Sequence, residues 1–363
     1  MPLGTIENID IKGIACVVPD NLVLSEAFYD NFEKDSVDKF VSMTGVKSRF
    51  IANKNQTASD LCYLSAKKLM DSLSWTQESV DAILFVSQTP DYRLPATACV
   101  LHNRLGLNDN CLAFDINLGC SGYVYGLQVI GALMQTGNIK RVLLLCGDTP
   151  SKIISPMDKS TSMLFGDCGS ATAIERVSEK QSSEIKYILK TKGNGYKAII
   201  VPSGCYRNMD GSNIRTEMEE GVIRSDYELY MNGMDVFNFT ISDVPKTINE
   251  FIQHFSIPLD SIDALVLHQA NLFMLKHIAK KLKFPFEKVP VTIDKYGNTS
   301  VASIPLTMAD SLNEKLKNNG KGLNLLLSGF GVGLSWGVIN IKLEPEVFLS
   351  VERSNECYND GGL

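Results

Sequence analysis

Cys120 has the surroundings of a reactive cysteine. It stands in the motif Gly119–Gly122 (Gly-Cys-Ser-Gly), between a strand-like apolar run at Leu112–Ile116 and a helical pattern at Tyr123–Gln135. A helix N-terminus favours the thiolate, which is the nucleophilic form of cysteine, and the flanking glycines leave room for a substrate. The alternative is a small buried cysteine that fills a gap in the core, which is the role we expect for Cys146, Cys168 and Cys99.

Two polar motifs in the second half of the chain also follow strand-like runs, where open α/β sheets bind their ligands. His268 follows the apolar run Ala264–Leu267 and precedes Asn271, which can cap the next helix. Asn298 lies in Tyr296–Ser300 (Tyr-Gly-Asn-Thr-Ser), where spacing alone supports helix capping and a polar catalytic role equally. Isolated histidines are usually structural, and we expect that of the other three, which are His102, His254 and His277.

A run rich in glycine, Gly329–Gly337, follows the strand-like residues Leu323–Ser328. Glycines at this place bring backbone N–H groups close to a substrate, so the run can form an oxyanion hole. A phosphate-binding loop is the weaker interpretation, because the run does not end in Gly-Lys-Ser or Gly-Lys-Thr.

Strand-like and helical patterns alternate along the chain, which predicts an α/β protein with mostly parallel sheets. The expected strands are Ala82–Ser87, Leu112–Ile116, Val142–Cys146, Ala264–Leu267, Val289–Ile293 and Leu323–Ser328. The expected helices are Thr57–Ser74, Ala96–Leu105, Tyr123–Gln135, Asp243–Phe255, Leu272–Lys283 and Ser303–Lys317. The polar residues 203–225 are expected to form a long surface loop.

The chain repeats itself once. Ser79–Val86 resembles Ser261–Leu267, and Leu143–Gly147 resembles Leu325–Gly329 at the same offset. Because one offset accounts for both matches, we expect a duplicated fold. The expected parts are a first half, a second half and a polar appendage, at residues 1–180, 181–342 and 343–363.

The composition is that of a folded protein with a large core. Of 363 residues, 44% are apolar and 21% are charged, and the formal net charge of −6 disfavours a broad nucleic-acid-binding surface. The apolar runs have only strand length and the N-terminus lacks a signal-peptide pattern, so we expect neither a membrane span nor secretion. Nine cysteines without Cys-x-x-Cys spacing indicate a reducing cytosol and argue against disulfides and against a metal site.

Together, these motifs resemble those of the thiolase-fold condensing enzymes, and most of all β-ketoacyl-acyl-carrier-protein synthase III. The resemblance extends from about Ile9 to Ile341. It rests on four motifs, Gly119–Gly122, His268–Asn271, Gly297–Ser300 and Gly329–Gly337. It implies a thiolase-like fold of two βαβαβαββ halves in five αβαβα layers, which agrees with the internal repeat, and a cytoplasmic homodimer. Thiolases carry a second cysteine in the glycine run, and this chain has none there.

The resemblance implies an acyltransferase that joins an acyl thioester to a malonyl thioester by decarboxylative Claisen condensation, as in fatty-acid biosynthesis. No metal or redox cofactor is expected. Cys120 would carry the acyl group, and His268 and Asn298 would hold the malonyl thioester. The backbone of Cys120, Gly331, Val332 and Gly333 would form the oxyanion hole. The donor would be an acyl group on coenzyme A or on acyl carrier protein, and the malonyl group would arrive on acyl carrier protein.

The expected substrate-binding residues are Leu94, Lys39, Lys159, Gln269, Asn271 and Phe273. Four of these positions differ from the residue that the family often has. Leu94 stands in place of a Phe, Lys39 in place of a Trp, and Lys159 and Phe273 each in place of an Arg. The differences leave two alternatives open. One is acyl transfer to an amine or alcohol in a specialised-lipid or surface-glycan pathway, and the other is a non-catalytic subunit of a condensing heterodimer.

Lys276, Lys280 and Lys283 share one face of the helix expected after His268. Carrier proteins are generally acidic, so this lysine stripe is a candidate docking site for acyl carrier protein. The alternative is an ordinary solvated helix face.

Overall fold

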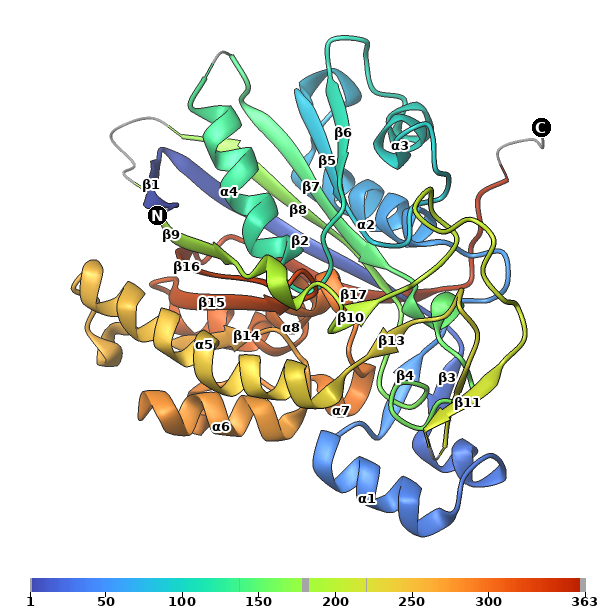
Figure 1. Ribbon diagram of the computed structural model, residues 1–363. Coiled ribbons are helices and arrows are strands. Elements are labelled where there is room, and N and C mark those ends of the chain that lie inside the picture. The colour runs from blue at the N-terminus through green and yellow to red at the C-terminus, as the bar shows by residue number, and fades with distance from the viewer. Residues whose placement is uncertain (1, 137, 178–182, 220, 360–363) are drawn as a thin grey trace.

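Two stacked β-sheets form the centre of the molecule (Figure 1). This computed structural model describes residues 2–136, 138–177, 183–219 and 221–359. The first sheet has the strand order β17-β2-β8-β7-β5-β6, and the second has the order β1-β9-β16-β15-β14. Their strands are β1 (Leu3–Glu7), β2 (Ile9–Pro19), β5 (Ala82–Val86), β6 (Leu112–Ile116), β7 (Arg141–Asp148), β8 (Cys168–Arg176), β9 (Glu184–Thr191), β14 (Ala264–Leu267), β15 (Leu323–Gly331), β16 (Ser335–Leu343) and β17 (Phe348–Ser354).

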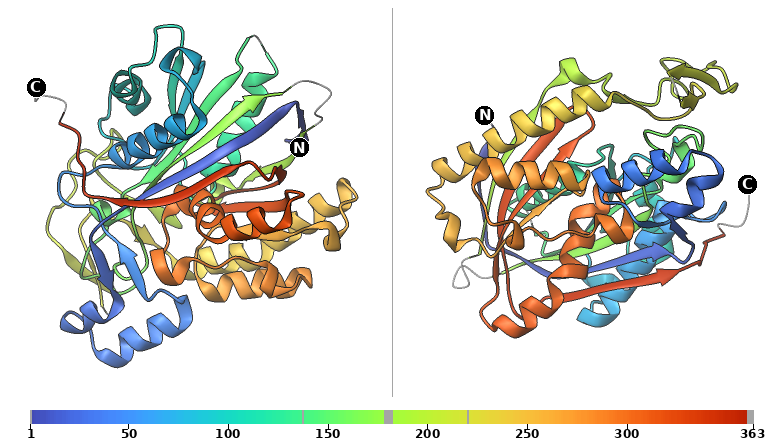
Figure 2. Two further views of the ribbon diagram at one scale, coloured as in Figure 1. Left: turned by 180° about the vertical axis from the view of Figure 1, so that it is seen from behind. Right: turned by 90° about the horizontal axis from the view of Figure 1, so that it is seen from below.

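Helices lie outside and between the sheets, which gives five layers in the order αβαβα (Figures 1 and 2). In the middle layer, α4 (Gly122–Met134) and α8 (Ser303–Ser311) contact both sheets and share the largest apolar core with them. The outer layers hold α2 (Ala58–Leu73) and α3 (Thr97–Leu105) on the first sheet, and α5 (Gly233–His254) and α6 (Leu272–Leu282) on the second.

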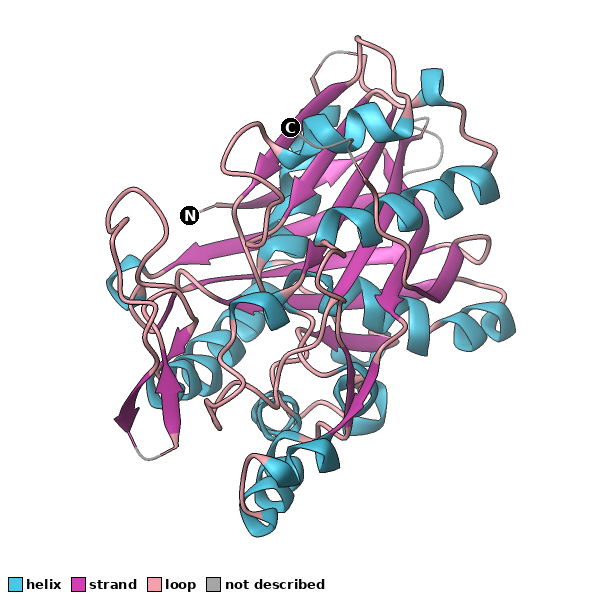
Figure 3. Ribbon diagram, turned by 90° about the vertical axis from the view of Figure 1, so that its right-hand side faces the viewer, coloured by secondary structure: helices cyan, strands magenta, loops and turns pink. Residues whose placement is uncertain are grey.

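The short elements lie mostly in the loops beyond one end of the sheets (Figure 3). They are β3 (Leu22–Leu24), α1 (Lys34–Thr44), β4 (Ser48–Phe50), β10 (Ile199–Ile200), β11 (Thr216–Glu219), β12 (Val222–Arg224), β13 (Tyr230–Met231), α7 (Ile293–Tyr296) and α9 (Asn313–Asn319).

The sequence repeat corresponds to equivalent strand pairs in the two sheets. In the first sheet β5 pairs in parallel with β7, and in the second sheet β14 pairs in parallel with β15. The repeat relates β5 to β14 and β7 to β15, so the duplicated arrangement that the repeat predicts is present.

Helix starts follow from local sequence, and the cap predicted at Asn271 is confirmed. Thr57 and Asp60 form a capping box at the start of α2, because each side chain accepts a hydrogen bond from the backbone N–H of the other residue. The side chain of Asn271 accepts a hydrogen bond from the backbone N–H of Met274 at 2.8 Å and caps α6.

The predicted strand Val289–Ile293 is wrong. Residues 289–292 form no strand, and α7 begins at Ile293. Pro290 has no N–H to donate, and the side chain of Gln269 takes the place of a neighbouring strand. It accepts from the backbone N–H of Thr292 at 3.0 Å and donates to the carbonyl of Pro290 at 3.4 Å.

Three further segments differ from the sequence prediction. The helix expected at Asp243–Phe255 begins ten residues earlier, because Asn232 caps it there and Pro245 does not interrupt it. The helix expected at Ser303–Lys317 breaks at Leu312 into α8 and α9. The loop expected at residues 203–225 contains the small hairpin of β11 and β12.

The C-terminal segment contributes a strand to the first sheet. Within residues 343–363, expected as an appendage, β17 pairs in parallel with β2 along Phe348–Ser354. The first strand, β1, pairs with β9 in the second sheet. The expected boundary between residues 180 and 181 lies outside the described residues, as do residues 360–363, and the division into 1–180 and 181–342 remains a proposal.

Within the described residues, no helix is long and apolar enough to cross a membrane.

Candidate active site

Cys120 lies at the tight connection between β6 and α4. Its side chain is buried, with 7% of the residue exposed. Gly119 has no Cβ, and a Cβ there would collide with the side-chain oxygen of Gln88. The glycine therefore lets the chain turn beside Gln88 and place the sulfur at the start of the central helix.

His268 follows β14 and is held as a neutral imidazole. Its Nδ1 lies 2.6 Å from the hydroxyl oxygen of Ser303, the first residue of α8, and its ring packs edge-on against Phe330 at 5.4 Å. Burial lowers the pKa of His268 from 6.5 to about 3. At neutral pH the ring therefore carries one proton, and with Nδ1 engaged by Ser303 its Nε2 is the nitrogen left for a substrate.

Asn298 is fixed at both backbone and side chain. Its N–H donates to the carbonyl of Leu164 at 2.9 Å, and its carbonyl accepts from the N–H of Gly166 at 3.1 Å. Its side-chain oxygen accepts from the N–H of Ser300 at 2.9 Å, which shapes the turn before α8. The two roles that spacing left open are compatible, because Oδ1 holds the turn while the Nδ2 amide still has protons to donate.

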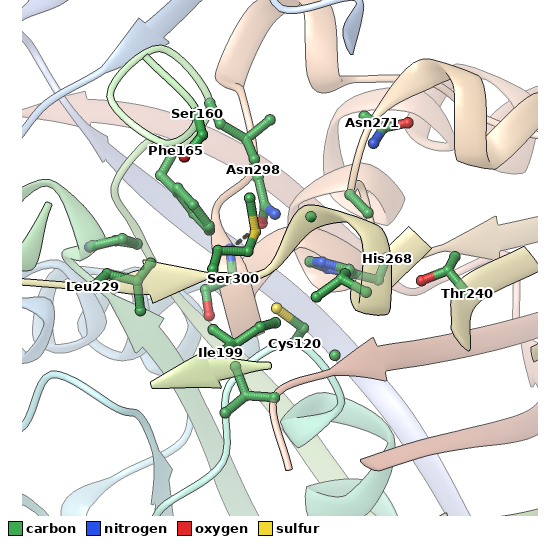
Figure 4. Close-up of a pocket in the computed structure, with 18 of the residues that line it drawn as sticks. Cys120, Ser160, Phe165, Ile199, Leu229, Thr240, His268, Asn271, Asn298 and Ser300 are labelled. Atoms are coloured by element: carbon green, nitrogen blue, oxygen red, sulfur yellow. Dashed lines mark hydrogen bonds between the residues drawn. The ribbon is translucent and has the colours of Figure 1, made fainter. Parts of the chain in front are cut away.

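These three side chains line one cavity of about 500 Å³ (Figure 4). They come from the first sheet's edge, the end of β14 and the segment before α8, and in Figure 4 they face the same space. Most of the remaining lining is apolar, and it includes Phe40, Leu164, Phe165, Ile199, Leu229, Met231, Phe237, Met274, Phe330 and Val332. The cavity therefore combines a nucleophile and two hydrogen-bond donors with walls suited to an acyl chain and its arm.

The glycine run forms the hairpin between β15 and β16 and packs directly on Cys120. Gly331 has a φ of 159°, and a Cβ added to it would lie 2.7 Å from the Cβ of Cys120. The hydroxyl of Ser335 donates to the carbonyl of Val332 at 2.7 Å and lies 2.7 Å from the hydroxyl of Ser121. These bonds hold the hairpin turn against the start of α4. Gly331 and Val332 line the cavity, and Gly333 lies one residue beyond them.

The thiol of Cys120 is not acidic in the resting site. Burial raises its pKa from 9.0 to about 12, and the negative charge of Asp148 acts in the same direction. The Ser300 hydroxyl and the backbone N–H groups of Cys120 and Val332 act in the opposite direction. The sequence predicted a thiolate favoured by the helix N-terminus, and the structure shows that burial outweighs this effect.

The other predicted substrate-binding residues lie in different places. Asn271 lines the cavity, and Gln269 is buried in its contacts with the segment before α7. Four other predicted residues are not among the described residues that line the cavity. They are Lys39, Lys159, Leu94 and Phe273. Leu94 is 75% exposed and Phe273 is 52% exposed. The three lysines of the stripe, Lys276, Lys280 and Lys283, are all exposed.

Sequence reasoning missed several polar groups of the cavity, among them Asp148 and Gln88. Asp148 ends β7, and Gln88 follows β5 by two residues, so both occupy the carboxyl ends of parallel strands. That position was a usable signal, because ligands bind beyond the carboxyl ends of such strands. Within the described residues, no group of three or more His, Cys, Asp or Glu side chains is arranged to hold a metal ion.

Comparison with solved structures gives the class of protein first. The crystal structure of a 3-oxoacyl-(acyl-carrier protein) synthase from Burkholderia xenovorans superimposes with a TM-score of 0.91 at 43% identity, over 97% of this chain and 99% of that one. A 3-oxoacyl-(acyl carrier protein) synthase III from Pseudomonas aeruginosa gives 0.80 at 28% identity, over 93% and 98% of the two chains. The fold is thiolase-like, and the chain is of the condensing-enzyme class.

Comparison of sequences then gives the family. Residues 114–193 match the family described as 3-oxoacyl-[acyl-carrier-protein (ACP)] synthase III, and residues 252–343 match its C-terminal part. The β-ketoacyl-[acyl-carrier-protein] synthase III of Clostridium perfringens is 32% identical over 338 residues, which are 93% of this chain and 100% of the relative. That of Clostridioides difficile is 36% identical, over 88% and 95% of the two chains. The chain belongs to the β-ketoacyl-[acyl-carrier-protein] synthase III family.

Proposed function

We propose that the protein is an acyltransferase that condenses an acyl thioester with malonyl-acyl carrier protein, releases CO₂ and forms a 3-ketoacyl thioester for fatty-acid biosynthesis. The observation that carries the proposal is that Cys120, His268 and Asn298 come from three separate elements and line one cavity. Its relatives are named for this class of reaction. Neither transfer to an amine or alcohol nor a non-catalytic role is favoured by those relatives.

The first half-reaction loads the enzyme. The Cys120 sulfur attacks the carbonyl carbon of the acyl donor, the bond from that carbon to the carrier sulfur breaks, and the thiol proton ends on the departing carrier. Negative charge develops on the carbonyl oxygen in the transition state. The backbone N–H groups of Cys120 and Val332 lower the pKa of the Cys120 thiol, which supports a role in stabilising this oxygen. Because Gly331 and Gly333 have no Cβ, the backbone of this turn can lie close to the reacting groups.

The second half-reaction uses two neutral hydrogen-bond donors. The carbonyl oxygen of the malonyl thioester accepts from Nε2 of His268 and Nδ2 of Asn298, and the bond to the carboxylate breaks with loss of CO₂. The enolate carbon then attacks the acyl group on Cys120, and the sulfur leaves as thiolate and regains a proton. A neutral His268 suits this step, because it donates a proton in a hydrogen bond without trapping the departing carboxylate.

The proposal assigns substrates rather than a bound cofactor. The acyl group arrives on coenzyme A or on acyl carrier protein, and no metal or redox cofactor takes part. Phe237 and Met274 line the same cavity as Cys120, and this apolar lining supports entry of an uncharged carrier arm. Of the other expected residues, Asn271 is proposed to contact this arm inside the cavity. Lys39, Lys159 and Phe273 are proposed to contact the carrier outside the cavity. The exposed stripe of Lys276, Lys280 and Lys283 supports carrier docking on α6.

We further propose a cytoplasmic homodimer. All nine cysteines are free, which suits a reducing compartment. The edge strand β6 carries Leu112 at 47% exposure, and Leu94, in the segment before α3, is 75% exposed. Open edges and exposed apolar side chains are normally covered, and a second copy along β6 would cover both. Light scattering coupled to size-exclusion chromatography measures the mass that decides between one and two chains.

The proposed function is tested by measuring the two half-reactions separately. Self-acylation is followed by intact-protein mass spectrometry, and malonyl decarboxylation by CO₂ release from malonyl-acyl carrier protein. His268→Ala and Asn298→Ala should lower decarboxylation by about 10²-fold or more, because each removes a donor to the enolate, and should lower self-acylation far less. Equal losses in both half-reactions, with thermal unfolding unchanged, would contradict the assigned roles.

A further inference from the structure

The hydroxyl of Thr240 is a buried polar group that neither the fold nor the reaction steps above use. The residue lies in α5 and lines the cavity, and only 1% of it is exposed. Its side chain forms no hydrogen bond with another described residue. A buried hydroxyl that is left without a partner costs free energy, so we expect a ligand in the cavity to supply one.

The other two hydroxyl side chains of α5 show the bond that Thr240 does not make. Ser242 and Thr247 each donate to the backbone carbonyl four residues earlier, at 2.6 Å and 2.9 Å. This is the usual way in which a hydroxyl inside a helix is satisfied. Figure 4 shows the oxygen of Thr240 turned toward His268 instead, so this hydroxyl faces the cavity rather than its own helix.

Thr240 belongs to the part of the cavity wall that the adjacent helices α5 and α6 provide. Phe237 lies three residues before it on α5, and its ring packs against that of Phe273 of α6 with 5.8 Å between the centroids. From α6 and its cap, Met274 and Asn271 line the same cavity. Of the side chains that these two helices and the cap contribute to the described lining, Thr240 and Asn271 are the polar ones.

These two polar groups complement a secondary amide. The side-chain oxygen of Asn271 caps α6, at 2.8 Å from the N–H of Met274, which leaves its NH₂ group as a donor. The hydroxyl oxygen of Thr240 is available as an acceptor. A secondary amide offers one carbonyl oxygen and one N–H group, so the pair matches both. The pantetheine arm that coenzyme A and acyl carrier protein share contains amides of this kind.

We propose that Thr240 is a specificity-determining residue for the carrier arm, and that its hydroxyl oxygen accepts a hydrogen bond from an amide N–H of the arm. The role rests on the proposed function, because it concerns the arm that both thioester substrates bring into the cavity. Asn271 donates to the carbonyl oxygen of the same amide. Holding the amide at these two points limits the positions that the thioester can take before it reaches Cys120.

The test is the binding of an arm analogue that cannot react. S-Methylpantetheine has the amides but no thioester, and its dissociation constant is the concentration that halves the rate of Cys120 alkylation by iodoacetamide. The paired analogue has an ester oxygen in place of each amide N–H, so it keeps the carbonyls and loses the donors. The wild type should bind the amide about threefold to tenfold more tightly than the ester. Thr240→Val should lose this preference, because valine keeps the shape of threonine and removes the acceptor.

Kinetics give a second readout. With acyl-pantetheine in self-acylation and with malonyl-pantetheine in decarboxylation, Thr240→Val should raise KM about threefold to tenfold and leave kcat unchanged, because the arm binds equally in the ground and transition states. Thr240→Ser keeps the hydroxyl and should restore the wild-type KM. The matched control is Ser242→Ala, which removes a hydroxyl from the same helix outside the described lining of this cavity and should change neither constant. Thr240→Val breaks no hydrogen bond within the described residues, so its unfolding free energy should not fall.

The outcomes distinguish this proposal from the proposed function. If neither analogue protects Cys120 in the wild type, the carrier arm does not occupy this cavity, and both proposals are wrong. If the arm protects Cys120 but Thr240→Val keeps the wild-type preference for amide over ester, the hydroxyl is merely hydrated and only the role of Thr240 is wrong. A KM that rises for the malonyl substrate alone would also overturn that role, because the hydroxyl would then contact the malonyl group rather than the arm.

Discussion

At the scale of single residues, the neutral state of His268 has a measurable consequence for stability. Its pKa in the folded protein, about 3, lies below its unfolded value of 6.5. The unfolded chain therefore binds a proton between these values and the folded chain does not, so stability is complete above pH 6.5 and is lost as the pH falls. Each pH unit in this window costs about 1.4 kcal/mol.

The comparison that isolates this effect is between the wild type and His268→Gln. The unfolding free energy of each protein is measured by denaturant unfolding at pH 6.5 and at pH 5. Between these two pH values the wild type should lose about 2 kcal/mol more stability than His268→Gln. Taking this difference removes the contribution of Asp167, whose pKa burial raises to about 6 and which acts with the opposite sign. A pH-independent difference for His268→Gln would mean that the imidazole is not held neutral.

At the scale of elements, the hairpin of β15 and β16 must approach α4 without a side chain at Gly331. In Gly331→Ala the new Cβ would lie 2.7 Å from the Cβ of Cys120 and 3.0 Å from its sulfur, so the hairpin or the nucleophile has to move. We expect self-acylation to fall by about 10²-fold and the unfolding free energy to fall by about 1–3 kcal/mol.

Gly193→Ala is the matched control for this prediction. Gly193 has no described atom within 4 Å of the position of an added Cβ. The control should keep wild-type acylation and stability. Unimpaired acylation of Gly331→Ala would show that the position of the hairpin is not critical.

The elements that carry the site could largely be predicted from sequence, and the failures have physical causes. Helical periodicity and caps located α2, α4 and α6 to within one or two residues, because these signals are local. The strand expected at Val289–Ile293 failed because its backbone is bonded by the side chain of Gln269 rather than by a neighbouring strand. The C-terminal β17 was missed because it is a short, partly exposed edge strand whose pairing with β2 depends on contacts distant in sequence.

At the scale of the whole molecule, docking of an acidic carrier can be separated from catalysis. Replacing Lys276, Lys280 and Lys283 by Glu should raise the KM for malonyl-acyl carrier protein several-fold at low salt and remove its salt dependence, because the steering charge is reversed. Self-acylation by a small acyl-CoA should change little. The measurement is a salt series of steady-state kinetics with each donor.

A second triple variant controls for net charge. Lys67, Lys317 and Lys321 are exposed and lie outside the described lining of the cavity, and their replacement by Glu changes the net charge equally. This control should keep the wild-type KM. If both triples behave alike, the stripe is an ordinary solvated helix face.

The meeting of the site residues could be predicted only in part from the duplication of the chain. The repeat relates β14 and β15, which His268 and the glycine run follow, to β5 and β7 of the other sheet, whereas Cys120 follows β6 and Asn298 follows α7, which the repeated segments do not include. The sequence could not reveal that Ser303 is the hydrogen-bond partner of His268, or that Asp148 and Ser300 line the same cavity as Cys120. Their residue types are common, and what distinguishes them is burial and mutual orientation.

The central claim is that Cys120 carries the acyl group during the reaction, and intact-protein mass spectrometry tests it most directly. The protein is incubated with a panel of acyl-CoA and acyl-carrier donors, and then with malonyl-acyl carrier protein. The account predicts a gain of one acyl mass that maps to the Cys120 peptide, is absent from Cys120→Ala and disappears when the malonyl substrate is added. Acyl mass that accumulates equally on Cys120→Ala, or that stays on Cys120 after malonyl-acyl carrier protein is added, would contradict it.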